Sequence, residues 1–242
     1  MSEVHHVFYQ KNWVFLQIPL STPSAIIPYQ IQSTSTTLKK EEITAFLKKE
    51  TQASFLHPHE FKHWMVGEQY LTLPNSIYDP ALKTSYFERV FGPCGKEHTL
   101  ETYSNKEYSF QQLYTQPLWW NDYTSQQFNQ QNGSPFVEFL LSNRSSSNAT
   151  CLILAVFNND FLVCISENNR LIFCDIFPYE TSDDILYFLI TLQAKLLFSM
   201  DEAALELYSF CPKMIEEKLL TNLGKIQHFA HLNVTYHTQA YL

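Results

Sequence analysis

The stretch CLILAVFNNDFLVCISENNRLIFCDIFPYE (residues 151–180) contains three apolar runs separated by two short polar turns. The runs cover residues 151–157, 161–166 and 171–177, and their Val, Ile, Leu and Phe content is typical of strands. Asn and Asp in the turns tolerate the positive φ angles that tight hairpins require. The pattern therefore predicts an antiparallel meander of three strands.

The residues after this meander predict helices and strands in alternation. A Thr-Ser-Asp-Asp sequence at 181–184 is typical of a helix start, because its acids lie at the positive end of the helix dipole. Ile185, Leu189, Leu192 and Leu196 then recur at helical spacing. A strand over 204–210, a helix over 213–222 and a last short strand over 225–234 follow. The element order of this half is βββαβα, closed by a strand.

The first half of the chain predicts a similar order. Its expected elements are strands over 4–9, 13–18 and 25–32, a helix over 37–50, a strand over 63–74 bent at Gly67, a helix over 79–92, a strand over 108–116, an aromatic helix after Pro117 and a helix over 134–142. LYTQP (113–117) and LYSFCP (207–212) each predict a strand end followed by a helix that a proline starts, so we place them at corresponding points of two related halves.

The polar segment SNRSSSNAT (142–150) is poor in apolar residues and is typical of a linker. It divides the chain into two expected domains, a first lobe over 1–142 and a second lobe over 150–242. A βββαβα lobe that occurs twice predicts an α/β protein with mixed sheets and two related lobes.

Two stretches resemble a known family. LIFCDIFPYETSDDILYFLI (171–190) and YLTLPNSIYDPALKTSYFERVFG (70–92) are similar to the pattern of an uncharacterised bacterial family with a ribonuclease-H-like, actin-like ATPase fold. The resemblance implies two ribonuclease-H-like lobes in an actin-like arrangement. It also implies similarity in shape to the actin-like platform proteins of pilus assembly and secretion. Because fold does not fix function, the resemblance predicts no activity by itself.

The residues argue against a working phosphate site. Actin-like ATPases need glycines where the backbone approaches the phosphates, and acids that hold Mg²⁺. The five glycines, Gly67, Gly92, Gly95, Gly133 and Gly224, all lie outside the hairpins expected to carry phosphate loops. The first hairpin, at Gln10–Asn12, has no acid, and the second has only Asp160. We therefore expect no catalytic residues and no cofactor. Weak nucleotide binding without hydrolysis, around Asn158 and Asp160, stays an alternative.

A second alternative comes from HPHEFKH (57–63). His59, Glu60 and His63 fit the H-E-x-x-H pattern of zinc hydrolases, which needs both histidines on one helix face and a third ligand. The following residues turn at once to strand character, which favours a solvated turn instead. Cys94, in the Gly-Pro-Cys-Gly turn, is the most exposed cysteine by pattern, and we interpret that turn as a helix end.

Composition limits the partners and the compartment. The net charge is −8 and only three arginines occur, which argues against nucleic acid and anionic membrane surfaces. No apolar stretch is long enough to span a membrane, so we expect no membrane insertion. Five cysteines without a CxxC pair, and no signal peptide, predict a reduced cytoplasmic protein. The sequence thus predicts a non-catalytic, cytoplasmic actin-like protein that serves as a binding or scaffold module for another protein; any small-molecule ligand stays unknown.

Overall fold

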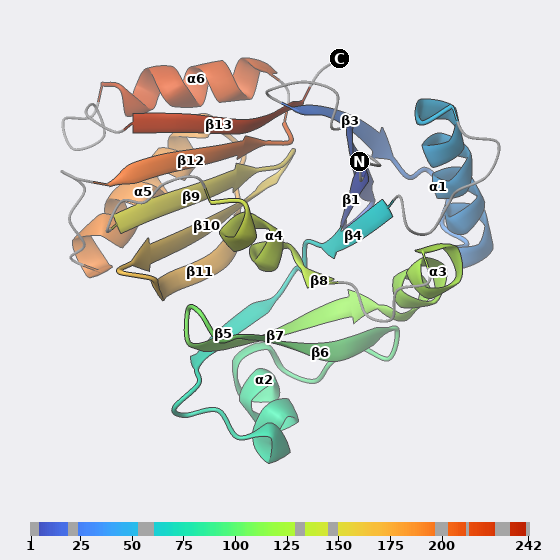
Figure 1. The fold of residues 1–242 in the computed structure, drawn as a ribbon, viewed down its shortest axis with the longest axis horizontal. Helices are drawn as coiled ribbons and strands as arrows, with labels where there is room; N and C mark the ends of the chain where they lie inside the picture. Colours follow the sequence, from blue (N-terminus) through green and yellow to red (C-terminus); the bar gives the residue numbers. More distant parts are fainter. Residues whose placement is uncertain are drawn as a thin grey trace.

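A computed structural model describes residues 5–18, 24–52, 61–128, 134–144, 150–196, 203–211, 213–225 and 233–240. These residues form one ten-stranded mixed sheet and one three-stranded antiparallel sheet, with helices on both faces of the larger sheet (Figure 1). The α/β class and the mixed sheet predicted from the sequence are confirmed. Residues 145–149, at the centre of the expected linker, lie outside the described residues.

The first half of the large sheet is built from an antiparallel meander and a parallel extension. β1 pairs with β2, β2 with β3, and β4 lies parallel to β1 on its other side. The spatial order is β3-β2-β1-β4-β8. The elements are β1 (His5–Gln10), β2 (Trp13–Ile18), β3 (Ser24–Gln30), α1 (Thr36–Glu50), β4 (Phe61–Met65), α3 (Leu118–Phe128), β8 (Ser134–Pro135) and α4 (Phe136–Ser142).

The second half repeats this plan. Its meander is antiparallel, as predicted, and its fourth and fifth strands run parallel to the first. The spatial order β11-β10-β9-β12-β13 matches that of the first half strand for strand. The elements are β9 (Thr150–Val156), β10 (Asp160–Glu167), β11 (Arg170–Pro178), α5 (Ser182–Leu196), β12 (Ala204–Ser209), α6 (Lys213–Leu223) and β13 (Asn233–Ala240).

β13 joins the two halves. It pairs in parallel with β12 on one side and with β3 on the other, where Thr238 lies opposite Ser24. The prediction of a last strand over 225–234 is wrong in position, since residues 224 and 225 form the turn after α6 and the strand begins at Asn233.

An inserted unit separates β4 from α3. It consists of β5 (Tyr70–Pro74), the 3-10 helix η2 (Pro80–Leu82), α2 (Lys83–Phe91), β6 (His98–Asn105) and β7 (Phe110–Pro117), with strand order β5-β7-β6. The predicted bent strand over 63–74 is therefore two strands in different sheets. The chain turns the corner at Gly67, whose N–H donates to the Tyr70 hydroxyl (2.6 Å), and that hydroxyl donates to the Met65 carbonyl (3.1 Å).

The insertion also corrects the predicted correspondence between 113–117 and 207–212. The first stretch ends β7 of the inserted sheet, whereas the second ends β12 of the large sheet. The topological counterpart of β12 is β4, because each lies parallel to the first strand of its half. Only the helices that follow, α3 and α6, correspond.

Local sequence signals explain several element ends. Asn168 and Asn169 both have positive φ (49° and 57°), as a tight hairpin between β10 and β11 requires. At the start of α5, Asp184 accepts hydrogen bonds from the Thr181 N–H (2.8 Å) and hydroxyl (3.1 Å). These bonds lower the pKa of the Asp184 carboxyl. Gly92 ends α2 at φ 81°, a conformation that L side chains rarely adopt.

The large sheet buries side chains on both faces. On one face of the second half, α5 and α6 cover Leu152, Leu154 and other apolar side chains. On the opposite face, α4 packs where the two halves meet (Figure 1). Phe210, after β12, lies in an aromatic cluster there. Its ring centroid is 4.8 Å from that of Phe157 and 5.2 Å from that of Phe8.

Candidate functional site

Two hairpin turns, one from each half of the large sheet, lie in contact with each other. The first is the β1–β2 turn at Lys11 and Asn12, where Lys11 takes φ 53° although it is not glycine. The second is the β9–β10 turn, which closes through a hydrogen bond from the Phe157 N–H to the Asp160 carbonyl (2.8 Å). Because the halves share one topology, these turns occupy equivalent positions. They are the hairpins that the sequence resemblance associates with phosphate loops.

Side chains tie these two hairpins together. The Lys11 ammonium donates to Asp160 Oδ2 at 2.7 Å, and the Gln10 amide donates to the same oxygen at 3.0 Å. Asp160 is buried, with 6% of its surface exposed, whereas 44% of the Lys11 side chain is exposed. A buried carboxylate needs a counter-charge and hydrogen-bond donors, and both come from the other hairpin.

This arrangement does not fit a triphosphate with Mg²⁺. Such a site needs free backbone amides around the phosphates, and an acid that is available to water on the metal. Here the Asn159 carbonyl accepts from the Tyr179 N–H (3.0 Å), Phe157 N–H is bonded within its own turn, and Asp160 is engaged by Lys11. Neither turn contains glycine. The one acid of the second hairpin is therefore bound by the first hairpin, through Lys11 and Gln10.

A cavity of about 440 Å³ adjoins the first hairpin. Its walls carry charges of both signs, from Lys39, Glu68 and Glu97, together with aromatic rings. The Lys39 ammonium lies 5.5 Å from the centroid of the Trp119 ring, within the range of a cation–π contact. Burial and then the charge of Glu68 raise the pKa of the Tyr9 hydroxyl, so Tyr9 stays a neutral phenol.

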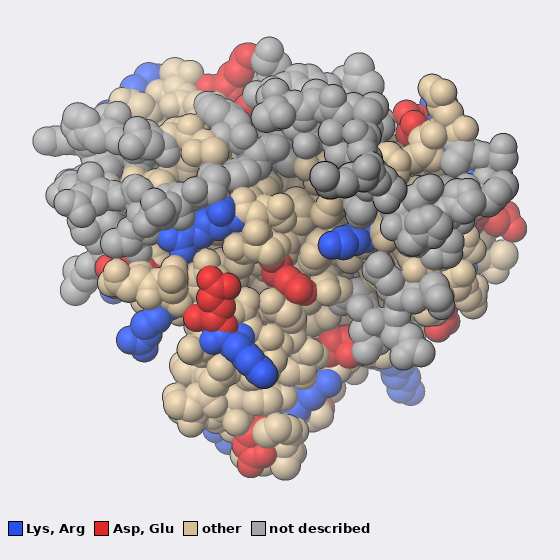
Figure 2. Space-filling view, viewed as in Figure 1, with Lys and Arg blue, Asp and Glu red and all other residues tan. Residues whose placement is uncertain are grey.

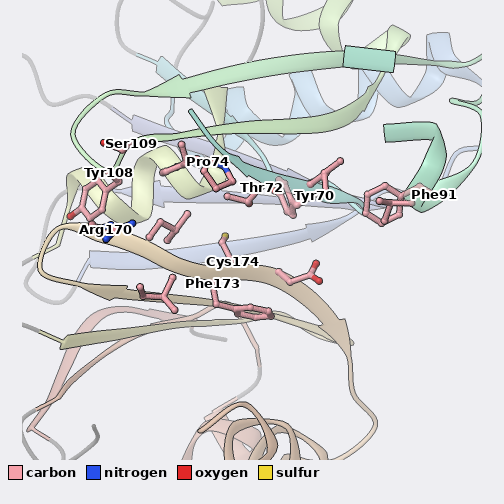
Figure 3. Close-up of a pocket in the computed structure, with 15 residues that line it drawn as sticks. Tyr70, Thr72, Pro74, Phe91, Tyr108, Ser109, Arg170, Phe173 and Cys174 are labelled. Carbon is pink, nitrogen blue, oxygen red and sulfur yellow. The ribbon is translucent and has the colours of Figure 1, made fainter. Parts of the chain in front are cut away.

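A second cavity, of about 380 Å³, lies between the inserted sheet and β11 (Figure 3). Tyr70 and Thr72 of β5 point toward it from one side, and Cys174 of β11 from the other (Figure 3). Val90, near the end of α2, and Ile172 on β11 line its mouth with 58% and 41% of their surfaces exposed. The lining is mainly apolar, unlike that of the first cavity.

Of the three residues of the zinc-hydrolase alternative, the structure describes His63. His59 and Glu60 lie outside the described residues. His63 lies in β4, which is paired with β1, and its ring is buried against Phe128 at a centroid distance of 5.8 Å. A helix that carries both histidines is therefore not formed, since residues 61–65 are a strand. Among the described residues, no group of three or more His, Cys, Asp or Glu side chains could hold a metal ion.

Cys94 lies after α2, half-buried, with its sulfur 3.7 Å from the His98 carbonyl. Burial and then the charge of Glu88 raise the pKa of its thiol, which makes it a poor nucleophile. The helix end predicted there is confirmed at Gly92.

Sequence reasoning placed Lys11 and Asp160 in the right turns but did not pair them. The equivalent position of the two hairpins was the signal that could have found the pair. The opposition of Cys164 and Cys174 on β10 and β11 was missed as well.

Comparison with known proteins places the chain in a family and agrees with the fold. The model of a family described as "Protein of unknown function (DUF3822)" matches residues 24–226. Among curated protein sequences, none matches the chain. A solved Bacteroides thetaiotaomicron VPI-5482 protein, with actin-like ATPase fold and unknown function, is similar at 10% identity and TM-score 0.70, covering 97% of this chain and 91% of that chain.

Two further solved structures are similar over most of their length. A PilM-PilN type IV pilus biogenesis complex matches at 9% identity and TM-score 0.49, with 96% of this chain and 90% of that chain covered. An Alp12 filament structure matches at 9% identity and TM-score 0.43, with 98% and 94% covered. The Bacteroides structure shows that the fold is actin-like, with two lobes. Within the described ranges, no helix has the length and apolar character needed to cross a bilayer.

Proposed function

This chain belongs to the DUF3822 family of proteins of unknown function, and from that premise we propose that it is a non-catalytic, cytoplasmic actin-like protein that binds a protein partner as a scaffold module. The observation that carries the proposal is the ion pair between Lys11 and Asp160, with Gln10 as second donor. It joins the two hairpins at the place where an actin-like ATPase would hold phosphates. The Asp160 carboxylate, the single acid of the second hairpin, is already compensated by Lys11 and Gln10.

Isothermal titration calorimetry with ATP and Mg²⁺ tests the proposal that the protein has no ATPase site. We expect no binding heat, because the two turns have no glycine and the Asp160 carboxylate is bound by Lys11 and Gln10. A micromolar isotherm that requires Mg²⁺ would contradict the proposal. Binding that does not require Mg²⁺, without hydrolysis, would instead support the alternative of a weak nucleotide binder around Asn158 and Asp160.

A double variant distinguishes two possible reasons why the protein would not bind ATP: the ion pair between Lys11 and Asp160, or the conformation of the backbone. If the ion pair merely blocks a functional site, Lys11→Ala with Asp160→Ala should gain ATP binding. If the backbone cannot wrap the phosphates, the variant should remain without binding, and this is the result we expect. Circular dichroism of the variant serves as the folding control.

The proposal that the chain binds a protein partner rests on exposed apolar side chains of the inserted unit. Ile77 and Val90 are each 58% exposed and Leu82 is 45% exposed. Val90 also lines the second cavity, together with Ile172 of β11. On the face drawn in Figure 2, the region of α2 and the inserted sheet is mostly uncharged, with scattered charges of both signs. Protein interfaces have an apolar centre with a polar rim, and the exposed apolar side chains of this unit would suit such a centre.

Affinity purification of tagged protein from its native cells tests this part. We expect a stoichiometric protein partner with the wild-type chain and at least a tenfold lower recovery with Ile77→Glu plus Val90→Glu. The matched control is Ile190→Glu, a change of an isoleucine that is 44% exposed on α5. Equal recovery by both variants would place the contact elsewhere and contradict the assignment of this surface.

The cysteines support the cytoplasmic part of the proposal. All five are free thiols in the structure, four of them buried, as is usual in reducing compartments.

A further inference from the structure

Cys164 and Cys174 form a directly opposed pair on neighbouring strands. Cys164 of β10 and Cys174 of β11 are partners in the antiparallel ladder, and their sulfur atoms lie 3.0 Å apart. Directly opposed residues of antiparallel strands have Cα atoms about 4.5–5.5 Å apart. A disulfide needs a Cα separation of about 4.4–6.8 Å. The backbone therefore already holds the two thiols at a separation that a disulfide can bridge.

A register shift creates this opposition. Glu167 pairs with Arg170 at the turn, and the pairing then slips between Ile165 and Ser166, so that Ile172 has no partner in the register. Without this bulge, Phe173 would lie opposite Cys164. The bulge turns the Cys174 side chain toward the inserted sheet, where the Gln112 amide nitrogen lies 3.8 Å from its sulfur.

The two thiols differ in access. Cys164 is fully buried, whereas Cys174 lines the cavity of about 380 Å³ between β11 and the inserted sheet. Figure 3 shows the Cys174 sulfur pointing into this space. Burial, followed by the neighbouring Cys174, raises the pKa of the Cys164 thiol well above its usual value. A small oxidant therefore meets Cys174 first, and Cys164 is in place to react second.

We propose that Cys164 and Cys174 are a peroxide-sensitive dithiol that closes reversibly to a disulfide. This proposal does not depend on the proposed function. The Cys174 sulfur attacks one oxygen of hydrogen peroxide, an S–O bond forms, the O–O bond breaks, and the departing hydroxide takes the thiol proton as water. Cys164 sulfur then attacks Cys174 sulfur, an S–S bond forms, the S–O bond breaks, and a second water leaves with the Cys164 proton. Two thiols lose two electrons and one peroxide becomes two waters.

The other cysteines lack this arrangement. Cys151 of β9 lies opposite Ser166, and the Cys211 sulfur contacts the Ser209 hydroxyl at 3.6 Å. Cys94, half-buried after α2, is far along the chain from the pair. The reaction should therefore be specific to β10 and β11, where it would cross-link the strands beside the bulge and alter one wall of the cavity.

The test exposes the folded full-length protein to hydrogen peroxide, blocks remaining thiols under denaturing conditions and maps the peptides by mass spectrometry. We expect a linked pair of peptides containing Cys164 and Cys174, lighter by two hydrogen atoms than the reduced pair. Titratable thiols should fall from five to three, because two of the five enter the disulfide, and dithiothreitol should restore all five.

Two variants sharpen the result. In Cys164→Ala the resolving thiol is missing, so Cys174 should persist as a sulfenic acid that dimedone traps. In Cys211→Ala, a matched change of another buried cysteine, the disulfide should form as in the wild type. Retention of five thiols, or oxidation confined to Cys94, would overturn the proposal. The peptide map of the wild-type protein shows whether the disulfide between Cys164 and Cys174 forms, even if a variant folds poorly.

Discussion

Replacing Phe210 with alanine is expected to lower the free energy of unfolding by about 3–5 kcal/mol, the usual cost of removing a buried phenylalanine. Phe210 is 1% exposed and belongs to the second half of the sheet. Its ring stacks on Phe157 (4.8 Å) and meets Phe8 (5.2 Å) and Phe15 (5.4 Å) of the first half edge-on. The change would leave a cavity at the junction of the two halves. Urea denaturation followed by circular dichroism measures the loss.

Tyr187→Ala is the control for this prediction. Tyr187 lies on α5 with 70% of its surface exposed, so its removal should change the free energy of unfolding by no more than about 0.5 kcal/mol. If Phe210→Ala cost as little as Tyr187→Ala, the aromatic cluster would not hold the halves together. The structural account of their junction would then be wrong.

The meander of the second half was predictable because its strands and its turns both carry residue types that are typical of those structures. The strands β9 and β10 are buried on both faces, so their sequences are continuous apolar runs. The turn between β10 and β11 carries two asparagines, and both have the positive φ that this residue type tolerates. Composition, periodicity and turn chemistry all favour the same structure there, and every predicted strand end lies within one residue of the observed end.

The inserted sheet was not predictable in the same way. β6, HTLETYSN, is half-exposed along most of its length, so it shows no alternation of apolar and polar residues. β6 forms a strand because it pairs with β7, and the apolar and polar pattern of its own residues does not predict that pairing. The break between β4 and β5 was predicted only as a bend, because both flanks have strand character and Gly67 is the single sign of a turn.

The site was predictable in position but not in its contacts. The sequence showed that both hairpins lack glycine, yet the contact of Lys11 with Asp160 spans 149 positions and exists only because the halves are equivalent. Likewise, a two-residue turn at Asn168 and Asn169 would place Cys164 opposite residue 173. The bulge that selects Cys174 depends on three-dimensional packing.

Lowering the pH from 6.5 to 4 is expected to reduce the free energy of unfolding by about 3 kcal/mol through His6 alone. Burial, with smaller contributions from Lys62 and His5, lowers the pKa of His6 from 6.5 to about 4. The ring nitrogen Nδ1 accepts a hydrogen bond from the Trp64 indole N–H (2.9 Å), which requires that nitrogen to be unprotonated. Between these pH values the unfolded chain binds a proton that the folded chain excludes. The stabilisation is thus complete above pH 6.5 and is lost as the pH falls to 4.

His6→Asn tests this assignment, because the asparagine carbonyl can still accept from the Trp64 N–H but does not titrate. Urea denaturation at several pH values should show that the difference in stability between pH 7 and pH 4 is smaller in this variant by about 3 kcal/mol. The loss of the ring contacts with Trp64 and Phe139 lowers the free energy of unfolding of the variant at both pH values. It therefore cancels when the difference between pH 7 and pH 4 is taken within each protein. An unchanged pH dependence in His6→Asn would mean that His6 is protonated in the folded protein and that its environment is wetter than the packing indicates.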